Sequence, residues 1–169
     1  ILRHNSIVLQ KAYRLRYGEN PHQSGAFYRE RNALHGSLGH AESLGSGAKE
    51  LSFNNLVDVD AALDAVREFE NPAAAVVKHT NPCGVATAPT LADAYRSARE
   101  ADPMSAFGGI VAMNREVDDA TAQIIAETFI ECVIAPGFSA GALERLFQGS
   151  RWQADEQVIL QLPPTASGE

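Results

Sequence analysis

The chain has 169 residues, of which 45% are hydrophobic and 21% charged, with 14 Lys and Arg against 21 Asp and Glu. Such a chain suits one domain with a buried core, and its composition excludes collagen-like, low-complexity and coiled-coil proteins. A net charge of −7 argues against a general nucleic-acid-binding protein, because that affinity depends on neutralising phosphates. We find no apolar stretch that could span a membrane and no signal peptide, so we expect a cytoplasmic protein without a membrane partner.

The N-terminal part of the chain combines short extended segments with polar connections. Alternating residues over 7–10 predict a strand. Residues 16–23 are polar and interrupted by Gly and Pro, which predicts a loop. Residues 26–29 can form a second short strand, and the composition of 32–52, rich in Gly, Ser and His, is typical of a surface connection.

From residue 55 onward, helical and extended patterns alternate. The predicted strands are 73–77, 109–113 and 132–135. The predicted helices are 56–70, 90–101, a helix that begins at Asp118 or Asp119, and 139–147. Alternation of this kind predicts an α/β fold with a largely parallel sheet covered by helices. Ligands of such sheets bind at the carboxyl ends of the strands, which places Lys78-His79, the segment near Gly108, and Pro136-Gly137 on candidate loops.

The segment after the first buried strand carries the strongest chemical signal. Lys78 and His79 enter a predicted turn that contains Pro82 and Gly84. A neighbouring ammonium disfavours imidazolium, which leaves His79 available as a base near neutral pH. Lys78 can stabilise negative charge that develops in a transition state. The alternative interpretation is a solvated lysine followed by a histidine that ends the strand.

Cys83 suggests two further kinds of chemistry. A nucleophilic cysteine beside a histidine is one, although the small apolar context favours an unreactive, half-buried thiol. A zinc nucleoside deaminase is the other, because Pro82-Cys83 matches the start of its P-C-x-x-C motif. However, Ala86 occupies the second cysteine position and Asn81 the position of the catalytic glutamate. We therefore expect no zinc, and we expect both cysteines to be reduced thiols.

Three other positions have both a functional and a structural interpretation. The Arg16 guanidinium suits phosphate, because its planar donors reach two oxygens at once, but a salt bridge with a nearby carboxylate is an alternative. The pair Gly108-Gly109 permits close approach of a ligand, or forms an ordinary turn. Glu131 is either an edge charge or a carboxylate that faces the hydroxyls or amine of a ligand.

Five segments, in this order, resemble the AICAR transformylase domain of the AICAR transformylase/IMP cyclohydrolase family. They are RYGENPHQ (16–23), KELSFNNLVD (49–58), KHTNPCGVA (78–86), DPMSAFGGIVA (102–112) and ECVIAPG (131–137). The resemblance implies a cytidine-deaminase-like three-layer α/β fold with a largely parallel mixed sheet, and it implies that the deaminase zinc is absent. It also implies formyl transfer from 10-formyltetrahydrofolate, as co-substrate, to the 5-amino group of AICAR.

The same resemblance assigns roles to individual residues. His79 corresponds to the proton acceptor, and Lys78 to the residue that stabilises the transition state. Positions that match substrate contacts of the family are Arg16, at the phosphate, Tyr17, His79, Gly108 and Glu131. The implied partners are AICAR and a folate, together with a second copy of the protein in a homodimer.

The resemblance also divides the chain. Residues 1–145 correspond to the N-terminal half of the transformylase domain, and we expect 146–169 to be a divergent or non-family tail. In the family the second half contacts the folate, so we expect the 169 residues alone to be inactive. The alternative is a non-catalytic nucleotide-binding or dimerisation module, which would bind AICAR without transferring a formyl group.

Overall fold

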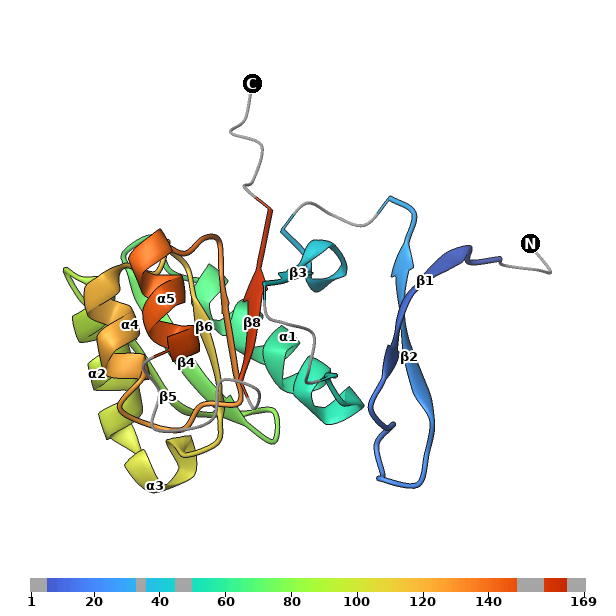
Figure 1. Cartoon of the computed structure of the whole chain (residues 1–169), viewed down its shortest axis with the longest axis horizontal. Coiled ribbons are helices and arrows are strands. Elements are labelled where there is room, and N and C mark those ends of the chain that lie inside the picture. The colour runs from blue at the N-terminus through green and yellow to red at the C-terminus, as the bar shows by residue number, and fades with distance from the viewer. Residues whose placement is uncertain (1–5, 33–35, 45–49, 149–156, 164–169) are drawn as a thin grey trace.

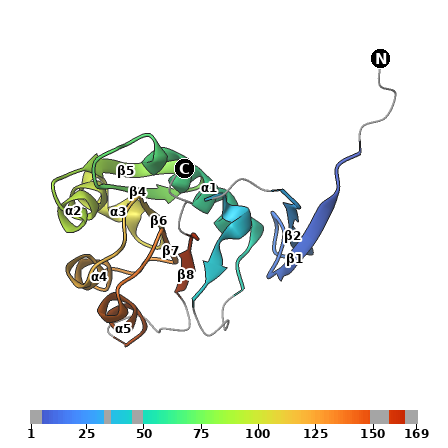
Figure 2. The same ribbon diagram turned by 90° about the horizontal axis from the view of Figure 1, so that it is seen from above.

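The computed structural model describes residues 6–32, 36–44, 50–148 and 157–163. A six-stranded sheet lies between two layers (Figures 1 and 2). One face is covered by three helices, α2 (Leu91–Ala101), α4 (Asp119–Ile125) and α5 (Ala140–Gln148). The other face is covered by α1 (Phe53–Arg67), the 3-10 helix η1 (Leu38–His40) and a separate hairpin of β1 (Leu9–Leu15) and β2 (Gly25–Glu30).

The sheet has the strand order β3-β8-β7-β6-β4-β5. Its strands are β3 (Glu42–Ser43), β4 (Ala73–Lys78), β5 (Asn81–Thr87), β6 (Ile110–Met113), β7 (Cys132–Ala135) and β8 (Val158–Gln161). The pairs β6–β7 and β7–β8 are parallel, whereas β3–β8, β4–β5 and β4–β6 are antiparallel. The α/β class and the mixed sheet are confirmed, but the parallel part is limited to three adjacent strands.

Strand β5 is the reason that the sheet contains more antiparallel pairing than the sequence suggested. The chain leaves β4 at Lys78 and returns at once through a two-residue turn, with Lys78 paired to Asn81. Pro82 and Gly84 pointed to a turn, yet both lie within β5. This strand is at the edge of the sheet. A proline is tolerated there, because an edge strand pairs with a neighbour on one side only.

Strand β4 forms the centre of the core. Every residue of β4 before Lys78 is buried, and successive side chains alternate between the two faces as a strand requires. Ala74 and Val76 face the layer of α2 and α4, and Ala73 and Ala75 face the layer of α1. The small side chains let helices pack closely on both faces, which fixes the end of β4 firmly.

Within the described residues, five helices begin with a side-chain cap, which satisfies backbone N–H groups of the first turn. At α5 the hydroxyl of Ser139 accepts from the backbone N–H of Ala142 (3.0 Å). Thr90, Asp102 and Asp118 each accept a hydrogen bond from the backbone three residues on, at the starts of α2, α3 (Pro103–Ala106) and α4. Ser52 starts α1 in a reciprocal capping box with Asn55. Helix α1 therefore begins and ends three residues earlier than the predicted 56–70, whereas the predicted starts of α2 and α4 are confirmed.

Strand β8 comes from the segment that we expected to be a divergent tail. It pairs in parallel with β7, and Ile159 is buried in the core between the sheet and the helices. The remaining parts of that segment, 149–156 and 164–169, lie outside the described residues. Across the described ranges, no helix combines the length and apolar character that a membrane-spanning helix needs.

Candidate functional site

The candidate residues gather at one edge of the sheet, but it is not the edge formed by the carboxyl ends of the parallel strands. Strand β4 runs antiparallel to β6, so Lys78 at the end of β4 lies beside the start of β6. Gly108 and Glu131 come immediately before β6 and β7. Pro136-Gly137 follows β7 and therefore lies at the opposite edge. The prediction that all three segments share the carboxyl edge was wrong, because it assumed that β4 is parallel to its neighbours.

The turn between β4 and β5 has an unusual backbone. His79 and Thr80 have positive φ angles of 53° and 62°, as both central residues of a type I′ hairpin turn require. Glycine and asparagine favour this conformation, whereas a β-branched threonine there is strained. The Asp58 carboxylate, on α1, accepts hydrogen bonds from the backbone N–H of His79 (3.1 Å) and of Thr80 (2.7 Å). The strained turn is thus bonded directly to α1, with the His79 side chain exposed.

Lys78 lies next to Gly108. Its ammonium donates a hydrogen bond of 2.8 Å to the carbonyl oxygen of Phe107, and a Cβ added to Gly108 would lie 4.0 Å from Nζ. Gly108 has a φ angle of 71°, which a residue with a side chain rarely adopts. The backbone N–H of Gly108 donates to the carbonyl of Phe129 (2.8 Å). The Lys78 ammonium and the backbone of Gly108 therefore lie side by side.

Glu131 is fixed against the start of α1. The Nδ2 of Asn55 donates to its carboxylate at 2.9 Å. The Oδ1 of Asn55 accepts from the backbone N–H and the hydroxyl of Ser52, at 3.0 and 2.8 Å. The capping box of α1 therefore orients the amide of Asn55 toward Glu131. The backbone N–H of Glu131 also donates to the carbonyl of Gly109 (3.0 Å).

These contacts form a closed series, which we call the contact ring. It runs through Asp58, His79, Lys78, Gly108, Glu131 and Asn55, and returns to Asp58 one turn further along α1. Lys78 is joined to Gly108 through the carbonyl of Phe107, and Gly108 to Glu131 through the carbonyl of Gly109. The ring brings a cation, a carboxylate, an exposed imidazole and the backbone of a glycine to one edge of the sheet. This combination suits a polar substrate that undergoes proton transfer while negative charge develops nearby.

The backbone of Arg16 and Tyr17 is hydrogen-bonded to the residues at the start of α1, beside this edge of the sheet. The N–H of Arg16 donates to the carbonyl of Leu51 (3.0 Å), and the carbonyl of Tyr17 accepts from the N–H of Phe53 (3.1 Å). Their side chains contact each other, with the guanidinium 3.2 Å from the Tyr17 hydroxyl and 4.8 Å from the centre of its ring. The described contacts therefore join both residues to the start of α1, while the Arg16 guanidinium stays exposed.

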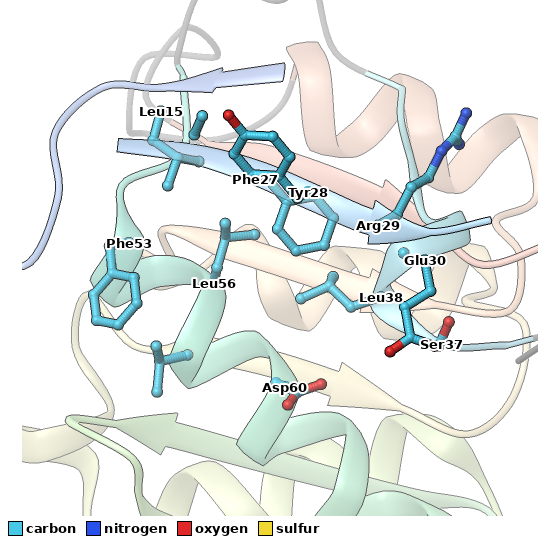
Figure 3. Close-up of a pocket in the computed structure, with 13 residues that line it drawn as sticks. Leu15, Phe27, Tyr28, Arg29, Glu30, Ser37, Leu38, Phe53, Leu56 and Asp60 are labelled. Atoms are coloured by element: carbon cyan, nitrogen blue, oxygen red, sulfur yellow. The ribbon is translucent and has the colours of Figure 1, made fainter. Parts of the chain in front are cut away.

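A separate apolar cavity lies between the β1–β2 hairpin and α1. Its volume is about 450 Å³, and Figure 3 shows Phe27 and Leu38 directed toward Leu56 across it. Asp60 and Glu30 lie at its margin. No residue of the contact ring lines this cavity, so it is distinct from the candidate site.

Neither alternative for Cys83 gains support from its surroundings. Burial and the charge of Asp102 raise the pKa of the Cys83 thiol, although Lys78 acts in the opposite direction. A raised pKa leaves less thiolate at neutral pH, and the thiolate is the reactive form. Within the described residues, no group of three or more His, Cys, Asp or Glu side chains is arranged to bind a metal ion.

Sequence reasoning missed the two α1 residues of the contact ring. Asn55 and Asp58 lie within the segment 49–58, but neither was singled out as a site residue. A usable signal was present, because positions three apart lie on the same face of a helix. Asn55 and Asp58 have this spacing, and both carry polar side chains in the first turns of α1.

Known proteins match the chain over most of its length. A sequence profile described as "AICARFT/IMPCHase bienzyme" matches residues 3–165. The protein named "Bifunctional purine biosynthesis protein PurH" of Sorangium cellulosum is 71% identical over 141 residues, which are 83% of this chain and 27% of the relative. Proteins of the same name from Myxococcus xanthus and Bacillus subtilis are 57% and 52% identical, again over 83% of this chain and 27% of each relative.

The chain thus spans about a quarter of the length of the curated relatives that it matches. The profile match includes β8 as well as the segments that form the contact ring. A match over residues 3–165 covers nearly all of the sequence. This chain belongs to the AICARFT/IMPCHase bienzyme family.

Proposed function

We propose that these 169 residues form the first half of an AICAR transformylase domain in purine biosynthesis. The reaction transfers the formyl group of 10-formyltetrahydrofolate to the 5-amino group of AICAR. The observation that carries the proposal is the contact ring, in which Lys78, Gly108 and Glu131 lie at one edge of the sheet beside the His79 turn. Family membership supports the choice of substrates.

His79 acts as the general base in this proposal. The AICAR amine is a weak nucleophile, because its lone pair is conjugated with the ring. As the nitrogen attacks the formyl carbon it must lose a proton, and a positioned imidazole can accept that proton. The exposed side chain of His79, on a turn fixed by Asp58, is suited to this role.

Lys78 supplies the positive charge. The formyl oxygen gains negative charge as its carbon becomes tetrahedral, and a preorganised ammonium stabilises that charge without reorganising at the moment of reaction. The bond from Lys78 to the Phe107 carbonyl restricts the ammonium to the neighbourhood of Gly108. The expulsion of tetrahydrofolate then completes the transfer.

Four residues contact the nucleotide in this proposal. Arg16 binds the phosphate, Tyr17 lies beside it, Gly108 admits the nucleotide to the backbone, and Glu131 accepts from its donor groups. The proposal includes a cytoplasmic homodimer as the assembled form, no zinc, and a folate site supplied by the remainder of the domain. No nucleic acid takes part.

Kinetics of a full-length bifunctional protein that carries these residues test the two catalytic roles. We expect His79→Ala to lower kcat for formyl transfer about 100- to 10,000-fold, and Lys78→Ala to cost about 2.7–4 kcal/mol of transition-state stabilisation. Lys11→Ala, which removes an exposed lysine of β1, is the matched control and should leave kcat unchanged. A near-normal rate in His79→Ala would contradict the assignment of the base.

Binding tests the role of Arg16. Arg16→Ala should weaken AICAR monophosphate roughly tenfold to a hundredfold or more, since a charged hydrogen bond contributes about 1.5–3 kcal/mol. The dephosphorylated nucleoside should lose little affinity. Arg145→Ala, on α5, controls for the general loss of a positive charge. Equal weakening of both ligands in calorimetry would show that Arg16 is structural.

The notion of a non-catalytic nucleotide-binding module is tested by the 169 residues alone. We expect this chain to bind AICAR and to show no formyl transfer at enzymatic rates of about 1–1000 per second. Formyl transfer by the full-length protein, lost in His79→Ala, would separate a half domain of an enzyme from a module that only binds.

A further inference from the structure

The geometry points to Asp58 as a positioning residue for His79, an inference that rests on the proposed function. Asp58 is half-buried on α1 and reaches the turn between β4 and β5 from a different layer of the fold. Its two carboxylate oxygens accept from two consecutive backbone N–H groups, those of His79 (3.1 Å) and Thr80 (2.7 Å). It therefore acts on the backbone that carries the imidazole and not on the substrate.

The turn needs such support. A two-residue turn with positive φ at both central residues is easily formed by Asn-Gly but not by His-Thr. Each residue in this conformation costs free energy, and β-branched threonine is the less favourable of the two. A strained backbone persists only where its surroundings fix it. Two hydrogen bonds to one charged carboxylate are a specific way to fix it, because they align both peptide planes at once.

Local contacts around the turn reinforce this arrangement without replacing it. The hydroxyl of Thr80 donates to the carbonyl of His79 (2.7 Å), and the amide of Asn81 donates to the same oxygen (2.8 Å). Both bonds stay within the turn, so they shape it but do not connect it to the rest of the protein. Asp58 connects the turn to α1 and thereby fixes the backbone position of His79.

The inference predicts a specific kinetic effect. In the full-length protein, Asp58→Asn should lower kcat for formyl transfer about 10- to 100-fold, since a small displacement of a catalytic group has that effect. In the asparagine an NH2 group replaces one of the two carboxylate oxygens, each of which accepts one N–H of the turn, so this paired arrangement is lost. KM for AICAR should change less than about threefold. Asp64→Asn, on the same helix, is the matched control, because the Asp64 carboxylate is exposed and pairs with Arg67 on the helix surface.

Relief of the strain provides the decisive comparison. Glycine adopts positive φ without steric cost, so Thr80→Gly should let the turn form with less help from α1. Asp58→Asn should then reduce kcat much less in the Thr80→Gly background than in the wild-type background. An equal reduction in both backgrounds would mean that Asp58 stabilises the fold in general, and would overturn the inference.

Amide hydrogen exchange tests the geometry without any assay of activity. In the 169-residue chain, Asp58→Asn should speed exchange of the His79 and Thr80 amides at least about tenfold, while Asp64→Asn should leave them unchanged. Unchanged exchange in Asp58→Asn would overturn the proposed attachment of the turn, even in an active enzyme. A wild-type full-length protein without formyl transfer would instead overturn the proposed function, and with it the catalytic consequence of Asp58.

Discussion

The two β-hairpins of the chain differ in how they are supported. In β4–β5, every residue of β4 before Lys78 is buried, and the strand pairs with β5 on one side and β6 on the other. In β1–β2, every residue of β1 before Leu15 is exposed, and the two strands form a separate sheet beside the main body (Figure 1). One hairpin is part of the core, and the other lies against α1 and η1.

The two parts of the proposed site therefore lie on hairpins that are stabilised differently. Lys78 and His79 lie on the central hairpin, where the core and Asp58 fix the backbone. Arg16 and Tyr17 lie on the connection of the outer hairpin, and a two-stranded hairpin has little stability by itself. We infer that the proposed catalytic groups are rigidly placed, whereas the proposed phosphate-binding groups depend on how well their loop is bonded to α1.

The largest expected effect comes from a change within the central hairpin. A Cβ at Gly84 would collide with the carbonyl oxygen of Ala98 and lie 2.8 Å from the Cβ of Ala101, both on α2. Because neither backbone can move easily, Gly84→Ala should lower the free energy of unfolding by about 3 kcal/mol or more. Thermal and denaturant unfolding measure this loss.

A matched glycine provides the control. At Gly137, on the opposite edge of the sheet, the nearest atom to an added Cβ is Glu116 Cγ at 3.4 Å. Gly137→Ala should therefore change stability by less than about 1 kcal/mol. Equal losses for the two variants would contradict the close packing of β5 on α2.

A smaller effect is expected from loosening the outer hairpin. The side-chain amide of Asn54, on α1, donates to the carbonyl of Glu19 at 3.1 Å, which bonds the connection 16–24 to the helix. Asn54→Ala should cost about 0.5–1.5 kcal/mol or less, since the bond is exposed. Trypsin should nevertheless cleave after Arg16 several-fold faster, because proteolysis follows local opening of the chain.

Mass spectrometry of the trypsin fragments over time measures that effect. Glu68→Gln, at the far end of α1, is the control and should leave cleavage after Arg16 unchanged. If Asn54→Ala also opened the central hairpin, cleavage after Lys78 would rise in parallel, and the distinction between the two hairpins would be lost.

The smallest effect concerns the thiol on β5. Burial, followed by the charge of Asp102, raises the pKa of Cys83. Its alkylation by iodoacetamide should therefore be slower than that of an unhindered thiol at pH 8, and the rate should continue to rise above pH 9. Asp102→Asn removes one of the causes of the raised pKa and should speed the reaction modestly. A rate that reaches its plateau below pH 8 would indicate an activated thiol instead.

The parts of the fold that repeat a regular pattern could be predicted from the sequence. The predicted strands 73–77, 109–113 and 132–135 were confirmed to within one residue at each end, since each is a short run of apolar residues. Strand β5 could not be found in this way, because Pro82 and Gly84 are ordinarily signals of a turn. Its place at the edge of the sheet and its close packing on α2 are tertiary features.

The candidate site could be predicted only in part, for the same reason. Local sequence was enough to single out Lys78, His79, Gly108 and Glu131, but not to place them relative to one another. Their common edge depends on the direction of β4, which is a property of the whole sheet. Asp58 joins a helix to a turn more than twenty residues away, and no local pattern reports such a pairing.

The most direct test of the account is an NMR titration of the ¹⁵N-labelled 169-residue chain with AICAR monophosphate, since it shows which edge of the sheet receives the ligand. Weak binding suffices, because millimolar affinity is measurable in this way. We predict that the amide signals of Tyr17, His79, Gly108 and Glu131 shift together and saturate at one ligand concentration, while the signal of Gly137 remains unchanged. Shifts centred on Gly137 and the carboxyl ends of β6 and β7, with the other four signals unmoved, would contradict the proposed site.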